Sequence, residues 1–140
     1  MKAISLWEPW ATAVAINLKR FETRSWSTSY RGPLLICASK KRLPFVRIVN
    51  LLLLARLTLN DLHYGRAVCI VDFVDILKTE DFIVSGIETK FGDFSAGRFV
   101  WKFDNIRRFI DPPWVRGKQG LFEVSDDLVS SALFEDNRLK

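Results

Sequence analysis

The residues that could do chemistry in this sequence gather in one short stretch, which holds Lys19, Glu22 and Arg24 and then Trp26. If a strand begins directly after the lysine, side-chain alternation places Glu22, Arg24 and Trp26 on one strand face. The lysine, at the end of a preceding helix, would lean over the same spot. An amine, a carboxylate, a guanidinium and an aromatic ring would then border one concave pocket. The alternative is a solvated, salt-bridging face, which contributes little to stability.

Two kinds of chemistry suit such a pocket. In a binding pocket, a charged Lys19 clamps a phosphate, and Glu22 accepts a hydrogen bond from an exocyclic amine, as carboxylates do with cytosine. In an enzyme, Lys19, Glu22 and Arg24 would be catalytic, with the carboxylate as general base towards a ribose 2′-hydroxyl. Of the three, Arg24 is the residue that we expect to brace the structure.

Basic and aromatic residues continue in two polar segments. A loop is predicted from Ser27 to Pro33. A second polar segment, from Ser39 to Arg42, leaves a buried strand predicted over Leu34–Ala38, and such loops often carry function. The formal net charge of +5 favours a polyanionic partner. The candidate nucleic-acid-binding residues are Lys19, Arg24, Trp26, Tyr30, Arg31, Ser39, Lys40, Lys41 and Arg42, which Arg107, Arg108, Arg116 and Lys118 could join.

Other catalytic and cofactor sites find little support in the sequence. A single histidine, His63, is insufficient for a Ser-His-Asp triad or a His-built metal site. Neither Gly-x-Gly-x-x-Gly nor a Walker loop occurs, so we expect no metal and no cofactor. Cys37 and Cys69 lie in apolar runs. We expect them to be buried thiols of a cytoplasmic protein, because the cytosol keeps thiols reduced.

The elements that must position these residues are strands interleaved with helices. Ala3–Leu6 is predicted as a strand, and a helix follows over Pro9–Leu18, since proline suits the first helical position. The elements predicted downstream are strands over Ala67–Leu77, Phe99–Asp104 and Leu121–Val124, a short helix over Thr79–Phe91 that carries Glu88, and a terminal helix capped by Ser125.

Aromatic residues flank the predicted helix and loop. We expect Trp7 and Trp10, at the helix start, to lie in the core. Trp26 or Tyr30, beside the polar loop, should be partly exposed near the pocket. The alternating aromatic face of Phe99–Phe103 is expected to be core rather than a stacking platform.

The stretch Leu43–Leu62 is predicted as one long helix, apolar nearly all round, with Pro44 in its first turn. A surface this apolar needs a partner, either the rest of the domain or a second copy of the chain. A homodimer through this helix is therefore one prediction. Arg47 and Arg56 interrupt the stretch, which leaves its uncharged runs well short of the ~20 residues of a membrane span.

The motifs described above resemble the ASCH (activating signal cointegrator homology) domain family, whose signature is Lys-x-x-Glu-x-Arg. The resemblance covers most of the chain and implies a small PUA-like, mostly antiparallel β-barrel with about three flanking helices, of class α+β. Residues 1–140 would form one domain. Asn17 stands where the family usually has Gly, and Asn is next best at a left-handed helix cap. The matching motifs are Leu6-Trp7, Pro9-Trp10, Ser25-Trp26, Tyr30-Arg31-Gly32, Ala38-Ser39-Lys40 and Gly97-Arg98.

The resemblance implies binding of RNA or another single-stranded nucleic acid, with a nucleotide or base in the pocket, and this is our first prediction. A second prediction is a metal-free hydrolase that acts on RNA or on a modified nucleoside such as N4-acylcytidine. For such a hydrolase, the family's Lys matches Lys19, its Thr falls on Glu22, and Glu88 matches its Glu loosely. A third prediction is a protein-interaction module that works through Leu43–Leu62.

Overall fold

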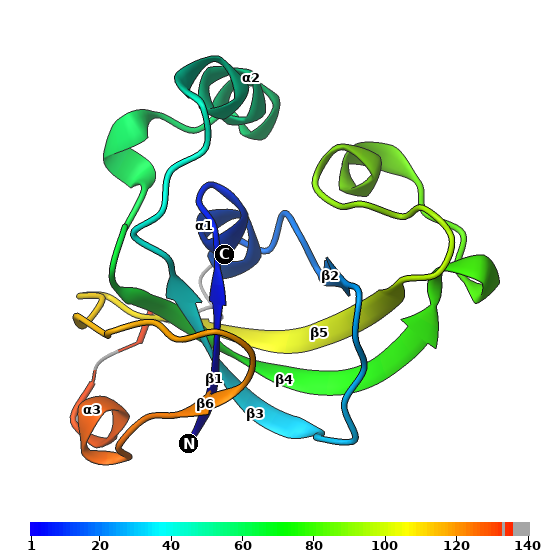
Figure 1. The fold of residues 1–140 in the computed structure, drawn as a ribbon. Coiled ribbons are helices and arrows are strands. Elements are labelled where there is room, and N and C mark those ends of the chain that lie inside the picture. The colour runs from blue at the N-terminus through cyan, green and yellow to red at the C-terminus, as the bar shows by residue number, and fades with distance from the viewer. Residues whose placement is uncertain (133, 136–140) are drawn as a thin grey trace.

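A curved six-stranded sheet is the frame of the molecule, shown in Figure 1 as a computed structural model. The structure describes residues 1–132, 134 and 135. In space the strands follow the order β2-β5-β4-β3-β1-β6; β1 and β3 run parallel, and the other neighbours run antiparallel. Their bounds are β1 Lys2–Leu6, β2 Phe21–Arg24, β3 Gly32–Ala38, β4 Ala67–Lys78, β5 Phe99–Arg108 and β6 Phe122–Glu123.

The described part of the chain contains three α-helices, as predicted. α1 (Trp10–Ala15) lies in the hollow of the sheet and contacts four strands, whereas α2 (Phe45–Ala55) lies further out (Figure 1). α3 (Asp127–Ser130) follows β6 and packs on the outer face of the sheet. Short 3-10 helices connect these elements: η1 Leu59–Asp61, η2 Thr79–Asp81 and η3 Gly86–Lys90.

The predicted barrel is present as a half-barrel. β2 and β6 are the two edges of the sheet, and among the described strands these edges do not pair with each other. α1 packs into the hollow of the sheet with five buried residues. The α+β class and the mostly antiparallel pairing are confirmed.

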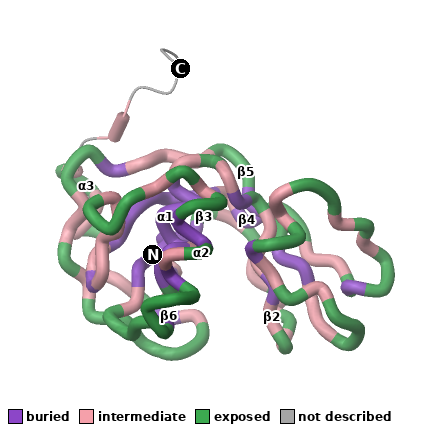
Figure 2. Tube along the Cα trace, turned by 90° about the horizontal axis from the view of Figure 1, so that it is seen from above, coloured by how far each residue is buried: buried purple, intermediate pink, exposed green. Residues whose placement is uncertain are grey.

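Both faces of the central strands are buried, which explains their continuous apolar runs. Leu34–Ala38 and Ala67–Val71 are buried throughout. On the inner face, the rings of Phe73 and Trp101 stack with their centroids 4.7 Å apart and pack with side chains of α1. Figure 2 shows these buried segments at the centre of the molecule, with exposed loops around them. The aromatic face of Phe99–Phe103 therefore belongs to the core, as predicted.

α1 ends at Ala15, earlier than the predicted Leu18, because the chain turns at Asn17. Asn17 has a φ of 62°, the left-handed conformation that we expected there. The backbone N–H groups of Leu18 and Lys19 both donate to the carbonyl oxygen of Ala13, at 2.9 and 3.1 Å. This turn sends the chain directly into β2.

The long helix predicted over Leu43–Leu62 is divided into α2 and η1. Arg56 adopts a left-handed conformation, with a φ of 56°, and ends α2. Leu43, Ile48, Leu51 and Leu52 are buried in a cluster with Phe91. The opposite side of α2 is exposed, and the homodimer through this region stays a prediction. The large apolar residues exposed there are Phe45, Val46, Leu53, Leu54 and Leu59.

Cys37 and Cys69 lie buried on β3 and β4, and neither forms a disulfide. Burial raises the pKa of the Cys37 thiol to about 12 and also raises the pKa of Cys69. Because the thiolate is the reactive form of cysteine, both side chains behave as core residues.

Glu8 anchors the start of α1 although it carries a charge and is fully buried. Its carboxylate accepts hydrogen bonds from the backbone N–H of Thr12 at 2.8 Å and from the Thr12 hydroxyl at 2.6 Å. It also accepts one from the backbone N–H of His63 at 2.7 Å. Glu8 therefore ties α1 to the segment that precedes β4.

We expect Glu8→Ala to lower the free energy of unfolding by about 2–6 kcal/mol in urea denaturation, because two backbone N–H donors lose their acceptor and each unsatisfied donor costs about 1–3 kcal/mol. The matched control is Glu123→Ala, which removes an exposed ion pair to Lys2 at 2.7 Å and should change stability little. Equal losses in the two variants would contradict the anchoring role of Glu8.

Candidate functional site

Two adjoining hollows open on the free side of the half-barrel, beside β2 and the end of β1. The first, the inner pocket, has a volume of about 260 Å³, and the second, the basic cleft, has a volume of about 490 Å³. Trp7 and Arg24 line both hollows and form their common wall. The inner pocket is completed by Leu6, Trp10, Glu22, Thr23, Arg47, Lys90 to Asp93 and Arg98, and the basic cleft by Ser5, Trp26, Ser39, Lys41 and Gly117 to Gly120.

Glu22 lines the inner pocket, with Lys19 behind it. The Glu22 side chain is 12% exposed, and its Oε1 accepts the backbone N–H of Thr23 at 2.8 Å and lies 3.8 Å from the Lys19 Nζ. Oε2 accepts no hydrogen bond from any described residue. Lys19 is fully buried and donates to the carbonyl oxygen of Phe21. Our expectation that Lys19 borders the pocket was wrong, because the turn at Asn17 directs it inward under β2.

Arg24 spans the open side of the half-barrel. Its Nη2 donates to the carbonyl oxygen of Ser5 at 2.9 Å, so β2 is linked to β1. Its buried Nε has no acceptor among the described residues. A guanidinium with unused N–H groups suits a carboxylate or phosphate. Arg24 thus braces the structure, as expected, at the wall shared by both hollows.

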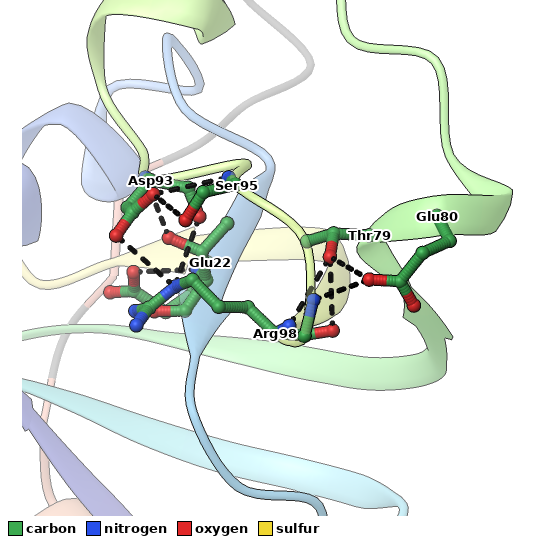
Figure 3. A network of polar contacts seen from close by, with 8 residues as sticks. Glu22, Thr79, Glu80, Asp93, Ser95 and Arg98 are labelled. Carbon is green, nitrogen blue, oxygen red and sulfur yellow. Dashed lines mark hydrogen bonds and ion pairs between the residues drawn. The ribbon is translucent and has the colours of Figure 1, made fainter.

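A polar network holds the outer wall of the inner pocket against β2 (Figure 3). The Thr23 hydroxyl oxygen accepts the backbone N–H of Asp93 at 3.0 Å. Arg98 donates through Nε to the carbonyl oxygen of Asp93 at 3.1 Å and lies 3.5 Å from its carboxylate. Hydrogen bonds from Ser95, with the nearby Arg98, lower the pKa of Asp93. Asp93 was not predicted from the sequence, although Arg98 belongs to the family resemblance. Because residues of the chain itself make these contacts, the wall of the pocket is already formed without a ligand.

Three tryptophans surround the hollows. Trp7, which we expected in the core, is 38% exposed; Glu8 occupies the buried position beside it. Trp10 is half-buried rather than core, and its Nε1 has no acceptor among the described residues. Trp26 is half-buried at the basic cleft, as expected, with its ring edge-on to Trp101 at 4.8 Å between centroids. Aromatic surface is therefore available in both hollows.

Some of the predicted basic residues gather at these hollows. Lys41 and Lys118 line the basic cleft, where Ser39 also lies. Lys40 and Arg116 line a further hollow next to it. Residues from the two ends of the chain are thus brought together, as the sequence analysis proposed for Arg116 and Lys118.

Other predicted basic residues are engaged elsewhere. The Arg42 guanidinium lies 4.0 Å from the ring centroid of Tyr64. The Arg31 guanidinium lies 4.8 Å from the ring centroid of Phe73. Arg31 precedes β3 and Ser39 follows it, so the two residues lie at opposite ends of this strand. Two more form ion pairs: Arg107 with Asp72 at 2.9 Å and Arg108 with Glu135 at 3.7 Å. Tyr30, beside Arg31, donates its hydroxyl to the carbonyl oxygen of Pro33.

Glu88 lies in η3; the single helix predicted over Thr79–Phe91 is replaced by the two 3-10 helices η2 and η3. Its Oε2 accepts the backbone N–H of Arg20 at 2.8 Å, and its buried Oε1 has no partner among the described residues. Glu88 lines neither the inner pocket nor the basic cleft. The hydrolase alternative, with Lys19, Glu22 and Glu88 as catalytic residues, stays a prediction.

Within residues 1–132, 134 and 135, no cluster of three His, Cys, Asp or Glu side chains could hold a metal ion. No helix of this described part is long and apolar enough to cross a membrane. A cytoplasmic location stays a prediction.

Comparison with known proteins decides the family. The sequence profile of the ASCH domain matches residues 4–113. The chain belongs to the ASCH domain family. Members of this family are usually linked to RNA binding. This ASCH domain is 34% identical over 139 residues to Activating signal cointegrator 1 of Mus musculus, a match that covers 92% of this chain and 23% of that protein. It therefore spans less than a quarter of this relative's length.

Solved structures share the fold. The ASCH protein of Zymomonas mobilis superposes with a TM-score of 0.58 at 13% identity, over 94% of this chain and 95% of that one. A mutant of the same protein gives a TM-score of 0.59 at 12% identity, over 94% and 98%. The curved sheet of this ASCH domain is thus the PUA-like fold that the resemblance implied.

We expect Arg24→Ala to lower the free energy of unfolding by about 1.5–3 kcal/mol, the range for a hydrogen bond to a charged group, as measured by urea denaturation. Arg24→Lys should recover only part of this loss, because an ammonium lacks the guanidinium fork. The control is Arg47→Ala, which removes an exposed arginine from the same pocket. A loss no larger than that of the control would contradict the bracing role.

Proposed function

We propose that this ASCH domain binds single-stranded nucleic acid and seats one unpaired base in the inner pocket. The observation that carries the proposal is the meeting of Trp7, Glu22 and Arg24 at a small pocket that adjoins a cleft lined by two lysines. The family's usual link to RNA makes RNA the expected natural ligand.

The size and lining of the inner pocket favour a single base. Its volume of about 260 Å³ is near the lower limit of ~300–1,000 Å³ for small-molecule sites. The exposed part of Trp7 offers a surface for stacking, which holds bases in single-strand sites regardless of their sequence. Oε2 of Glu22 can accept a hydrogen bond from an exocyclic amine, as carboxylates do with cytosine.

The basic cleft supports the binding of phosphates next to the seated base. Lys41 and Lys118 approach it from segments far apart in the sequence, and Arg24 faces it from the shared wall. A positive groove beside aromatic surface is the usual arrangement of single-strand binding proteins. A duplex could not place a base in the inner pocket without unpairing it, which costs a few kcal/mol.

Fluorescence anisotropy with labelled single-stranded oligonucleotides tests the cleft. If about four phosphates are neutralised, log K should fall with log salt at a slope near −3. The double variant Lys41→Ala, Lys118→Ala should weaken binding to all sequences and reduce the steepness by up to about 1.4. The control, Lys78→Ala with Lys102→Ala, removes the same charge from exposed positions outside the two hollows and should keep the wild-type slope.

Glu22→Gln tests the inner pocket with the same titrations. The variant keeps the side-chain size, so we expect an unchanged salt slope and a reduced preference for bases with an exocyclic amine. A thermal melt of the variant checks that the fold survives, since the buried Lys19 amine loses its nearby carboxylate. No binding of wild type to RNA or DNA oligonucleotides at low salt would contradict the proposed function itself.

A further inference from the structure

A third hollow, the Trp114 hollow, adjoins the basic cleft on the side away from the inner pocket. Its main feature is Trp114, which is 64% exposed and which the sequence analysis did not single out. Three cationic residues line the same hollow: Lys40, Lys41 and Arg116. The 94% exposed Ile83, in contrast, lines none of the hollows described above. An exposed tryptophan within a cationic rim suits an anionic ligand that carries flat rings.

The Trp114 backbone is held firmly. Trp114 pairs with Arg66 in an isolated antiparallel bridge just before β4. Two backbone hydrogen bonds flank this bridge. The N–H of Val115 donates to the carbonyl oxygen of Gly65 at 3.0 Å, and the N–H of Ala67 donates to the carbonyl oxygen of Pro113 at 2.8 Å. The segment is therefore fixed to the sheet, and a ligand would find the tryptophan already in place.

One face of the Trp114 ring is occupied by a cation, and the residue is still 64% exposed. The Arg66 guanidinium lies 4.0 Å from the ring centroid. Arg66 is itself held by the carbonyl oxygen of Pro112 at 3.3 Å and lies 3.8 Å from the Asp111 carboxylate. A cation held under an aromatic ring strengthens the platform on which a base can stack.

The Trp114 hollow is continuous with the basic cleft. The two share Ser39, Lys41 and Gly117 as lining residues, and the basic cleft in turn shares Trp7 and Arg24 with the inner pocket. The three hollows therefore lie in a row, with Trp7 in the inner pocket and Trp114 in the last hollow. Cationic side chains line the basic cleft between them.

We infer that Trp114 is a second stacking site, which takes a base of the same nucleic-acid strand several nucleotides from the base in the inner pocket. The inference rests on the proposed function, because it assumes a strand in the basic cleft. Lys40, Lys41 and Arg116 neutralise the phosphates next to the stacked base. Short strands occupy the inner pocket and the cleft, and longer strands also reach Trp114.

The test measures binding of oligocytidylate RNA of increasing length to wild type, Trp114→Ala and Trp114→Phe. Wild-type affinity should rise with length until the strand reaches Trp114. Trp114→Ala should bind the shortest strands as wild type does and the long ones about 5- to 100-fold more weakly, the range for losing one stacked base. Trp114→Phe should recover most of the loss, since a phenyl ring still stacks. The matched control is Ile83→Ala, which should match wild type at every length.

Equal affinities of wild type and Trp114→Ala at all lengths would overturn the inference while the proposed function stands. A loss of the same size on the shortest and longest strands would also overturn it, because that result indicates a general change in the domain. If wild type binds none of these strands, both the proposed function and this inference are contradicted. The salt slope should be the same for Trp114→Ala and wild type, because stacking releases no counterions.

Discussion

The hydrogen bond from Arg24 to the carbonyl oxygen of Ser5 sets the geometry of the open side of this domain. β2 is a four-residue edge strand that pairs only with β5 among the described strands. Without the guanidinium, its free edge would face a gap. Because Arg24 spans that gap to β1, it links the two strands at the wall shared by the inner pocket and the basic cleft.

Two buried charged residues hold chain segments in place. Glu8 accepts hydrogen bonds from α1 and from the segment before β4, and Lys19 donates to the backbone at the start of β2 and lies close to Glu22. Burial of a charge is costly unless hydrogen bonds compensate it. Such compensation requires one specific arrangement of the segments. Glu8 and Lys19 thereby orient α1 and β2, and Glu22 and Arg24 project from β2.

The positive charge of the domain is concentrated at the basic cleft and the Trp114 hollow, because several arginines elsewhere contact aromatic rings or carboxylates of the chain itself. Arg42 lies over Tyr64, Arg31 lies over Phe73, and Arg107 pairs with Asp72. Apart from Arg24 of β2, the cations that line the basic cleft and the Trp114 hollow are contributed by the segments after β3 and before β6. The alternation of cations and tryptophans along these hollows suits a flexible strand, whose phosphates and bases can be bound in turn.

The sequence by itself determined the elements whose signals are local. The buried strand at Leu34–Ala38 follows from a continuous apolar run. The left-handed turn at Asn17 was implied by the family resemblance, which has Gly there, and Asn tolerates positive φ. Only the tertiary structure decided that Lys19 lies inside, that Trp7 is exposed, and that Trp114 lies beside Lys40. These placements depend on where distant segments meet and on which polar groups find partners there, and periodicity along the chain carries no information about either.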